Sequence, residues 1–230
     1  NVSHELKTPI GALIALAETL EVDDDAEVMK RLAGRVLHEA ERLGRIVDDL
    51  LDLSVLEVQA APDRSAARIA DVISEAVDRL APAARTAGAE LTIAEVSEGS
   101  IVCDRRQIVS ALCNLLENGL KYLDDGEEAV RAVAIGASRD GTDVVFHVTD
   151  TGIGIPESDR ERIFERFYRV DRARSRQTGG TGLGLAIVRH VAHVHGGSTQ
   201  VRSEEGAGST FLLVIPSGLS EGPPMQDASP

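Results

Sequence analysis

The first 57 residues carry two stripes of aliphatic side chains, spaced mostly three or four residues apart. This spacing puts the apolar residues on one face of an α-helix and predicts two amphipathic helices, separated by the acidic residues 21–25. Neither helix can bury its stripe alone. We therefore expect residues 1–57 to form a helical hairpin, and two paired copies to form a four-helix bundle. The stripes consist of Val2, Leu6, Leu13, Leu16 and Leu20, and of Leu32, Val36, Leu43, Ile46, Leu50 and Leu53.

After the hairpin the pattern changes. Residues 58–65 lack any apolar period and are predicted to be a linker. Residues 66–216 alternate helical and strand patterns, which predicts an α+β sandwich with helices on one face of a mixed sheet. The tail, residues 217–230, is rich in Gly, Pro and Ser and is expected to be disordered. The predicted helices span 70–87, 105–122 and 183–195, and the predicted strands span 91–96, 100–103, 130–139 and 143–149, with two more ending at Pro216.

Two local signals mark boundaries within the sandwich. Asp104 precedes a helical pattern and is predicted to be its N-cap, because a carboxylate can accept hydrogen bonds from the first free N–H groups of a helix. Asp140-Gly141 separates two strand patterns, as in a tight β-hairpin. Between that turn and position 150, Phe146 and Val148 alternate with Val145, His147 and Thr149, as expected for a sheet packed on one face.

Composition excludes several classes of function. The formal charge of −14 argues against nucleic-acid binding, which needs clustered basic residues. The two cysteines, Cys103 and Cys113, are too few for a disulfide framework or a metal site, which fits a reducing cytosol. No run approaches the roughly 18 apolar residues of a membrane span, so no membrane contact is expected from this segment. Because the chain starts at Asn1 inside a helical pattern, we expect it to be a piece of a longer protein.

The first candidate functional segment, residues 3–9, surrounds a histidine. His4 lies off the apolar stripe and is expected to face water. Glu5 could hydrogen-bond one ring nitrogen and leave the other free to attack an electrophile. Thr8 is four residues on and so lies on the same helical face, while Pro9 is expected to bend the helix. A lone histidine is more often an ordinary surface or core residue, and it is these neighbours that favour a chemical role.

A second segment lies on the helix predicted over 105–122, where four polar residues share one face. Two amide oxygens and an ammonium group on one stripe would suit a metal-bound triphosphate. An amphipathic helix with a few solvated polar residues is the alternative. The four residues are Asn114, Asn118, Lys121 and Tyr122.

A third segment, residues 150–156, directly follows a predicted strand. Gly152 and Gly154 would allow a ligand to approach the backbone closely. The carboxylate of Asp150 could accept a hydrogen bond from an amino group. An ordinary turn has the same appearance in sequence.

The fourth segment is aromatic: residues 163–169 contain half of the chain's four Phe and one of its two Tyr. Arg169 ends it, and a basic run of Arg172, Arg174 and Arg176 follows in this acidic protein. A lid that meets a triphosphate would explain these charges, and a solvated loop is the alternative.

Two glycine-rich stretches complete the set. Residues 179–185 open a predicted helix, where free backbone N–H groups and the positive end of the helix dipole attract phosphates. The stretch is neither a P-loop nor a dinucleotide-binding fingerprint, because no strand precedes it and no Lys follows. The second stretch, residues 206–211, has a plain hairpin turn as its alternative.

In this order and spacing the segments resemble the sequence boxes of sensor histidine kinases of two-component systems, over residues 1–216. The resemblance is nearest in type to the phosphate-sensing kinases of actinobacteria. It implies a dimerisation and phosphotransfer hairpin followed by an ATP-binding domain of the histidine kinase and clamp ATPase superfamily. It further implies that His4 is the phosphoacceptor, that Glu5 is its general base, and that Thr8 positions water for dephosphorylating the partner.

The resemblance also assigns nucleotide contacts. It implies that Asn118 ligates Mg²⁺, that Asp150 bonds the exocyclic amine of adenine, and that Arg169 contacts phosphate. Gly119 stands where the family usually has Ala, a small cost to the helix. The expected nucleotide-binding set is Asn114, Asn118, Lys121, Tyr122, Asp150, Gly152, Gly154, Arg169, Gly180, Thr181, Gly182, Leu183 and Gly184.

The expected function is autophosphorylation of His4 by ATP with Mg²⁺, followed by transfer to an aspartate on the receiver domain of a response regulator. A homodimer, phosphatase activity toward that partner, and a cytoplasmic location within a membrane-anchored parent protein are expected as well. One rival is a clamp-type ATPase, a class that lacks the His-Glu-x-x-Thr-Pro helix. The other is an inactive scaffold, against which the intact Asn118 and Asp150 argue.

Overall fold

The computed structural model describes most of the chain, in two compact units that each contain buried apolar side chains. The first unit is built from residues 1–59 and 162–186, and the second from residues 60–161 and 187–230. The residues described are 2–22, 25–58, 62–124, 126, 130–170 and 180–217.

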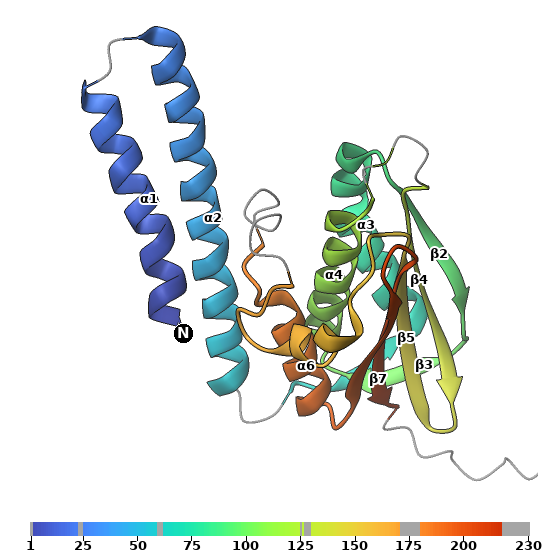
Figure 1. Cartoon of the computed structure of the whole chain (residues 1–230). Helices are drawn as coiled ribbons and strands as arrows, with labels where there is room; N and C mark the ends of the chain where they lie inside the picture. Colours follow the sequence, from blue (N-terminus) through green and yellow to red (C-terminus); the bar gives the residue numbers. More distant parts are fainter. Residues whose placement is uncertain are drawn as a thin grey trace, which may run out of the picture. The chain divides into compact units, whose positions relative to one another are not determined.

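The first unit begins with the predicted helical hairpin, formed by α1 (Val2–Val22) and α2 (Ala26–Val58), which pack side by side (Figure 1). Asp25 caps α2: its Oδ1 accepts hydrogen bonds from the backbone N–H groups of residues 27 and 28, at 2.9 and 3.3 Å. Three members of the predicted α2 stripe, Leu32, Ile46 and Leu53, are buried.

The second unit contains a five-stranded mixed sheet in the order β2-β4-β5-β7-β6. β2 runs parallel to β4, and the other neighbouring pairs are antiparallel. The predicted alternation is confirmed, since Phe146 and Val148 are fully buried while His147 is partly exposed and Thr149 is exposed. Gly141 forms the β4–β5 turn with φ of 59°. The strands span Glu90–Val96 (β2), Ala132–Asp140 (β4), Asp143–Asp150 (β5), Ser198–Glu204 (β6) and Gly208–Pro216 (β7).

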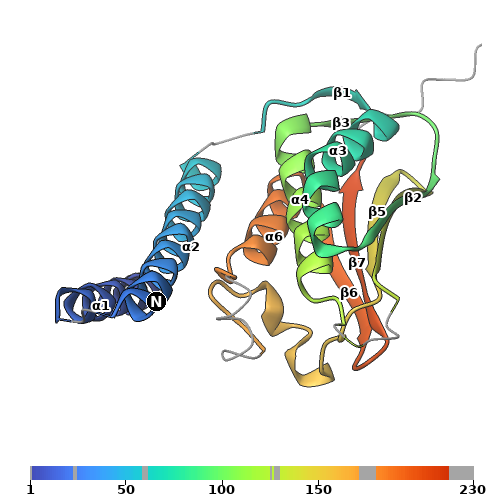
Figure 2. The same ribbon diagram turned by 90° about the horizontal axis from the view of Figure 1, so that it is seen from above.

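Helices α3, α4 and α6 cover one face of this sheet (Figure 2). Asp104 is the N-cap of α4, as predicted: its Oδ1 accepts from the N–H groups of residues 106 and 107, at 3.1 and 3.2 Å. The predicted fold class, a helical hairpin followed by an α+β sandwich, is therefore confirmed. The helices span Ile69–Ala87 (α3), Arg105–Lys121 (α4) and Gly184–Val194 (α6), and two short 3-10 helices span Glu157–Asp159 and Arg162–Phe164.

A small second sheet differs from the expectation. β1 (Ser65–Arg68) pairs antiparallel with β3 (Ser100–Cys103), and neither strand joins the five-stranded sheet. Ser65, predicted to belong to the linker, is the first residue of β1. Ser217, predicted to belong to the disordered tail, is buried: its N–H donates to Thr142 O at 2.9 Å, and its carbonyl accepts from Val102 N at 2.9 Å. Residues 218–230 lie outside the described residues.

In the described ranges, every helix is too short or too polar to cross a membrane.

Candidate nucleotide and phosphoacceptor sites

The predicted polar face of α4 lies near the C-terminal end of that helix. Asn114 and Asn118 are both partly exposed, and Asn114 Nδ2 donates to Ser110 O at 3.0 Å. Tyr122 caps the helix, with its N–H donating to Asn118 O at 3.1 Å. The Lys121 ammonium lies 5.5 Å from the centre of the Tyr122 ring. The four predicted residues are thus accessible to a ligand along the last two turns of one helix.

Asp150, the last residue of β5, is a buried carboxylate with 5% of its surface exposed. Its Oδ1 accepts from the N–H groups of Gly152 at 2.9 Å and Ser209 at 3.2 Å. Among the described residues, no hydrogen bond is made by its other oxygen. Burial raises the pKa of Asp150 from 3.8 to about 6, although the two N–H groups act in the opposite direction. The site therefore holds a carboxylate with one oxygen fixed by the backbone and one available to a ligand.

The end of α4 contacts the turn that follows Asp150. Tyr122 O accepts from Ile153 N at 3.1 Å, and Leu123 bridges to Gly152. A Cβ on Gly152 would lie 2.3 Å from Tyr122 O, so this close approach requires glycine. The structure thereby brings the predicted asparagine face and the predicted Asp150 turn together in the second unit.

The last glycine stretch, residues 206–208, is the β6–β7 hairpin turn and also supports Asp150. Gly206 N donates to Ile153 O at 2.8 Å. Gly208 has φ of 89°, and a Cβ there would lie 2.1 Å from Asp150 O. Ser209, the next residue, supplies the second N–H to the carboxylate. The sequence did not indicate Ser209, because its contribution comes from the backbone.

In the first unit, the predicted aromatic segment contacts the predicted phosphate-binding glycines. Phe167 N donates to Gly182 O at 2.8 Å, and Phe167 has the left-handed φ of 63°. A Cβ on Gly182 would lie 2.9 Å from Phe167 Cα. Ile163 and Phe164 are buried, and Arg169 is partly exposed. Residues 171–179, which include the predicted basic run and Gly179, lie outside the described residues.

The glycine stretch continues directly into α6. Gly180 is buried, and Thr181 Oγ1 accepts from Leu183 N at 3.2 Å and donates to Asp49 Oδ2 at 2.5 Å. Gly184 is the first residue of α6, whose first N–H groups have no partner within the helix. This local arrangement is the one that favours anions at helix N-termini.

The predicted phosphoacceptor segment lies on α1 of the first unit. His4 and Glu5 are within the first turns of that helix, and their side chains lie outside the described residues. Thr8 is exposed. The helix continues through Pro9, which is buried.

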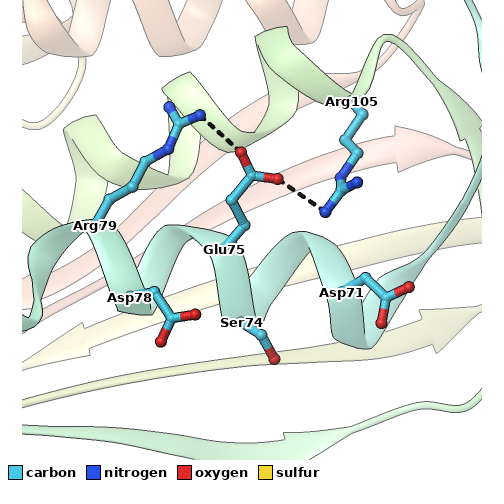
Figure 3. A pocket seen from close by; sticks show the side chains of 6 residues that line it. All are labelled: Asp71, Ser74, Glu75, Asp78, Arg79 and Arg105. Carbon is cyan, nitrogen blue, oxygen red and sulfur yellow. Dashed lines mark hydrogen bonds and ion pairs between the residues drawn. The ribbon is translucent and has the colours of Figure 1, made fainter.

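A hollow of about 620 Å³ on α3 and α4 contains none of the predicted site residues (Figure 3). Glu75 lies at its centre and forms ion pairs with Arg79 at 2.7 Å and Arg105 at 2.8 Å. An anion that entered this hollow would have to compete with the Glu75 carboxylate for both guanidinium groups. Within the described ranges, no three His, Cys, Asp or Glu side chains come together in a way that could hold a metal ion.

Comparison with known proteins gives matches over both parts of the chain. Residues 1–59 match the His Kinase A (phospho-acceptor) domain, and residues 103–219 match the histidine kinase-, DNA gyrase B- and HSP90-like ATPases. Sensor-like histidine kinase SenX3 of Mycobacterium tuberculosis is 45% identical over 218 residues, which cover 94% of this chain and 52% of SenX3. Sensor protein SrrB of Staphylococcus aureus is 33% identical over 220 residues, which cover 94% of this chain and 37% of SrrB.

A solved structure of another protein has a similar fold. ShkA in complex with AMPPNP has a TM-score of 0.67 and 29% identity, over 93% of this chain and 44% of ShkA. A phosphoacceptor hairpin joined to an ATPase-type sandwich defines the histidine kinases as a class of protein. This chain belongs to the sensor histidine kinase family, and the resemblance inferred from its motifs is confirmed. The chain spans about half the length of SenX3.

Proposed function

We propose that this chain is the catalytic part of a sensor histidine kinase, which transfers the γ-phosphoryl group of ATP to His4 and then to an aspartate of a response regulator. The observation that carries this proposal is that one chain matches both a phospho-acceptor domain, over residues 1–59, and an ATPase-type domain, over residues 103–219. A phosphoryl donor site and a phosphoryl acceptor site on one chain are what autophosphorylation requires.

Adenine recognition is assigned to Asp150. A carboxylate oxygen that accepts no other bond can accept one from the exocyclic amine, and burial strengthens that contact. The second oxygen is held by Gly152 and Ser209, so the acceptor is oriented before the ligand arrives. The relative ShkA has been solved with AMPPNP, an adenine nucleotide, which supports the same ligand class here.

The phosphates are assigned to two basic side chains and to the start of a helix. Lys121 and Arg169 would supply positive charge, and the N–H groups of residues 182–184 would supply donors at the start of α6. Mg²⁺ would neutralise charge on the β- and γ-phosphates, and the amide oxygen of Asn118 would be its protein ligand. One amide oxygen fits this role, because Mg²⁺ bound to nucleotides takes few protein ligands and keeps several waters.

The chemical step is in-line phosphoryl transfer, which depends mainly on positioning and charge neutralisation. One ring nitrogen of His4 forms a bond to the γ-phosphorus as the bond from that phosphorus to the β–γ bridging oxygen breaks. ADP leaves with the electron pair. Glu5 accepts the hydrogen bond from the other ring nitrogen, which keeps the attacking nitrogen unprotonated and balances the developing positive charge.

A second transfer passes the phosphoryl group from His4 to an aspartate of a receiver domain, and this regenerates the neutral histidine. Thr8, exposed on α1, would position a water that later hydrolyses the partner's aspartyl phosphate. We expect this part of the protein to work in the cytoplasm, where ATP and response regulators are found, within a longer membrane-anchored parent protein.

A clamp-type ATPase is the rival with the same sandwich. It is not favoured, because residues 1–59 match a phospho-acceptor domain that has no role in clamp closure. An inactive scaffold would bind nucleotide without any transfer.

Incubation with ATP labelled in the γ-phosphate separates the three functions. We expect the protein itself to become labelled, and the label to be lost in acid but retained in alkali, as for a phosphate on nitrogen. Release of labelled inorganic phosphate from an unlabelled protein would indicate an ATPase instead. Nucleotide binding without label or hydrolysis would indicate a scaffold, and either result would contradict the proposal.

A further inference from the structure

The chain that leaves the hairpin attaches to the second unit at one small cluster of residues. Asp63 N donates to Asp104 Oδ2 at 3.2 Å. Arg64 Nη2 donates to Val194 O at 2.9 Å. Asp104 is the N-cap of α4, and Val194 is the last residue of α6. Two consecutive residues of the incoming chain therefore hold the start of one helix and the end of another.

His195 joins these two helix ends directly. It is 3% exposed, its Nε2 lies 3.1 Å from Asp104 N, and its Nδ1 lies 2.8 Å from Val191 O. Since Asp104 N–H can only donate, Nε2 must accept, and Nδ1 must carry the proton that it donates to the Val191 carbonyl. A single neutral tautomer satisfies both bonds. Burial lowers the pKa of His195, which favours this neutral form.

Arg64 suits its position for an electrostatic reason as well. The last carbonyl groups of an α-helix have no partner within the helix and carry the negative end of its dipole. The Arg64 guanidinium satisfies one of these carbonyls on α6. Its side chain is exposed, so this contact lies at the surface and can be removed without opening the core.

Both helices held here carry some of the proposed nucleotide contacts. α4 bears Asn114 and Asn118 near its other end, and α6 begins directly after the phosphate-binding glycines. They lie side by side in both views (Figure 1 and Figure 2). A shift of residues 63 and 64 would therefore act on both helices, at the ends opposite to their nucleotide contacts.

We propose that Arg64 and His195 are positioning residues for phosphoryl transfer: with Asp104 they fasten the chain arriving from the phosphoacceptor hairpin to both nucleotide-binding helices. This inference rests on the proposed kinase function. The anchor is not needed to bind ATP, because each helix keeps its own buried apolar side chains. It is needed to hold the bound triphosphate in a fixed direction relative to residues 63 and 64.

Arg64→Gln tests the anchor, with Arg68→Gln as the matched control. Arg68 is another exposed arginine four residues later, whose side chain is 74% exposed and forms an ion pair with Asp71 at 3.9 Å. ATP affinity, the maximal rate of self-labelling and thermal unfolding would be measured on each protein. We expect Arg64→Gln to lower the maximal labelling rate about ten-fold while ATP affinity stays within about two-fold, because misplacement affects transfer and not binding. Arg68→Gln should match the wild type.

His195→Gln and His195→Leu extend the test to the second positioning residue. Gln keeps an acceptor for Asp104 N–H and should retain most of the labelling rate, whereas Leu removes it and should act like Arg64→Gln. Equal rates in Arg64→Gln and wild type, or a parallel fall of rate and ATP affinity, would overturn the anchor. Wild-type protein that binds no ATP would contradict the proposed function itself, and the anchor with it.

Discussion

The helical hairpin and the sandwich bury their apolar residues to very different extents. In the sandwich, Ile135, Phe146 and Val148 are fully enclosed between the sheet and the helices. On the hairpin, by contrast, one apolar stripe is buried and another remains exposed. Six of the nine large apolar side chains that are exposed among the described residues lie on α1 and α2, namely Ile10, Ile14, Met29, Leu37, Val47 and Leu51.

The difference shows that the sandwich completes its own core, while the hairpin needs another surface to cover it. Leu37 and Leu51 are two heptads apart on α2 and are 61% and 59% exposed. A heptad spacing of this kind is typical of helices that pack along a partner helix. We infer that the covering surface is the same stripe of a second copy, which would produce the four-helix bundle expected from the sequence.

The double change Leu37→Glu with Leu51→Glu should have the largest effect, which is to weaken dimerisation through the hairpin. Burying one leucine contributes about 1.5–3 kcal/mol, and a symmetric dimer buries each twice, so the dimer dissociation constant should rise by roughly 1,000-fold or more. Sedimentation at a series of concentrations measures it. ATP affinity should not change. Ile93→Glu is the control, since Ile93 is a comparably exposed residue of the sandwich, at 48%, and its change should leave the dimer intact.

Asp150→Asn should have the opposite pattern: weaker ATP binding by the sandwich and an unchanged dimer of the hairpin. Asn keeps the Oδ1 acceptor for Gly152 and Ser209 but removes the charge that faces the ligand. A hydrogen bond to a charged group contributes about 1.5–3 kcal/mol, so ATP affinity should fall by roughly 10- to 100-fold. Titration calorimetry measures this, and sedimentation should show an unchanged dimer. Unchanged ATP affinity would mean that Asp150 only supports the turn.

The same variant should stabilise the protein without nucleotide. Burial raises the pKa of Asp150 to about 6, so the native state holds this proton more tightly than the unfolded chain does. Ionising this carboxyl group therefore lowers the free energy of unfolding, and the loss grows as the pH rises from 3.8 to about 6. Asp150→Asn should raise the free energy of unfolding by about 2–3 kcal/mol at pH 8, with the gain shrinking toward pH 4. Urea unfolding at several pH values would test this, and a gain independent of pH would contradict it.

Gly119→Ala in the sandwich should slightly lower the free energy of unfolding, whereas Gly34→Ala in the hairpin should slightly raise it. A Cβ on Gly119 would lie 3.1 and 3.3 Å from the two γ-carbons of Val133, which is tight. A Cβ on Gly34 of α2 would meet nothing within 4 Å. Alanine favours a helix by about 1 kcal/mol, so Gly34→Ala should be stabilising. Overpacking should offset that gain at Gly119 and leave a net loss of about 1 kcal/mol. Thermal unfolding of both variants compares them, and stabilisation at both sites would contradict the tight packing.

Much of the fold could be predicted because its signals are local. The stripe of α2, the Asp104 cap and the Asp140-Gly141 turn each specify their own element. β1 could not be predicted, because Ser65–Arg68 is short, without alternation and mostly exposed. It is a strand only through its pairing with β3, more than thirty residues away.

Sequence motifs indicated the side chains of the candidate site, but not the backbone groups that contact them. Motif spacing indicated Asp150 and the glycines, whereas Ser209 was missed because any residue except proline could supply its N–H group. That the β6–β7 turn packs against Asp150 depends on strand order, which no local pattern in the sequence reports.

The central claim is that ATP held by the sandwich phosphorylates one histidine of the hairpin. Labelling with γ-labelled ATP and Mg²⁺ should therefore be compared in the wild type, His4→Gln and His38→Gln, with ATP binding measured on the same samples. His38 is the matched control, since it is an exposed histidine of α2. We predict acid-labile label in the wild type and His38→Gln, none in His4→Gln, and equal ATP affinity in all three. Acid-labile label that persists in His4→Gln would contradict the account.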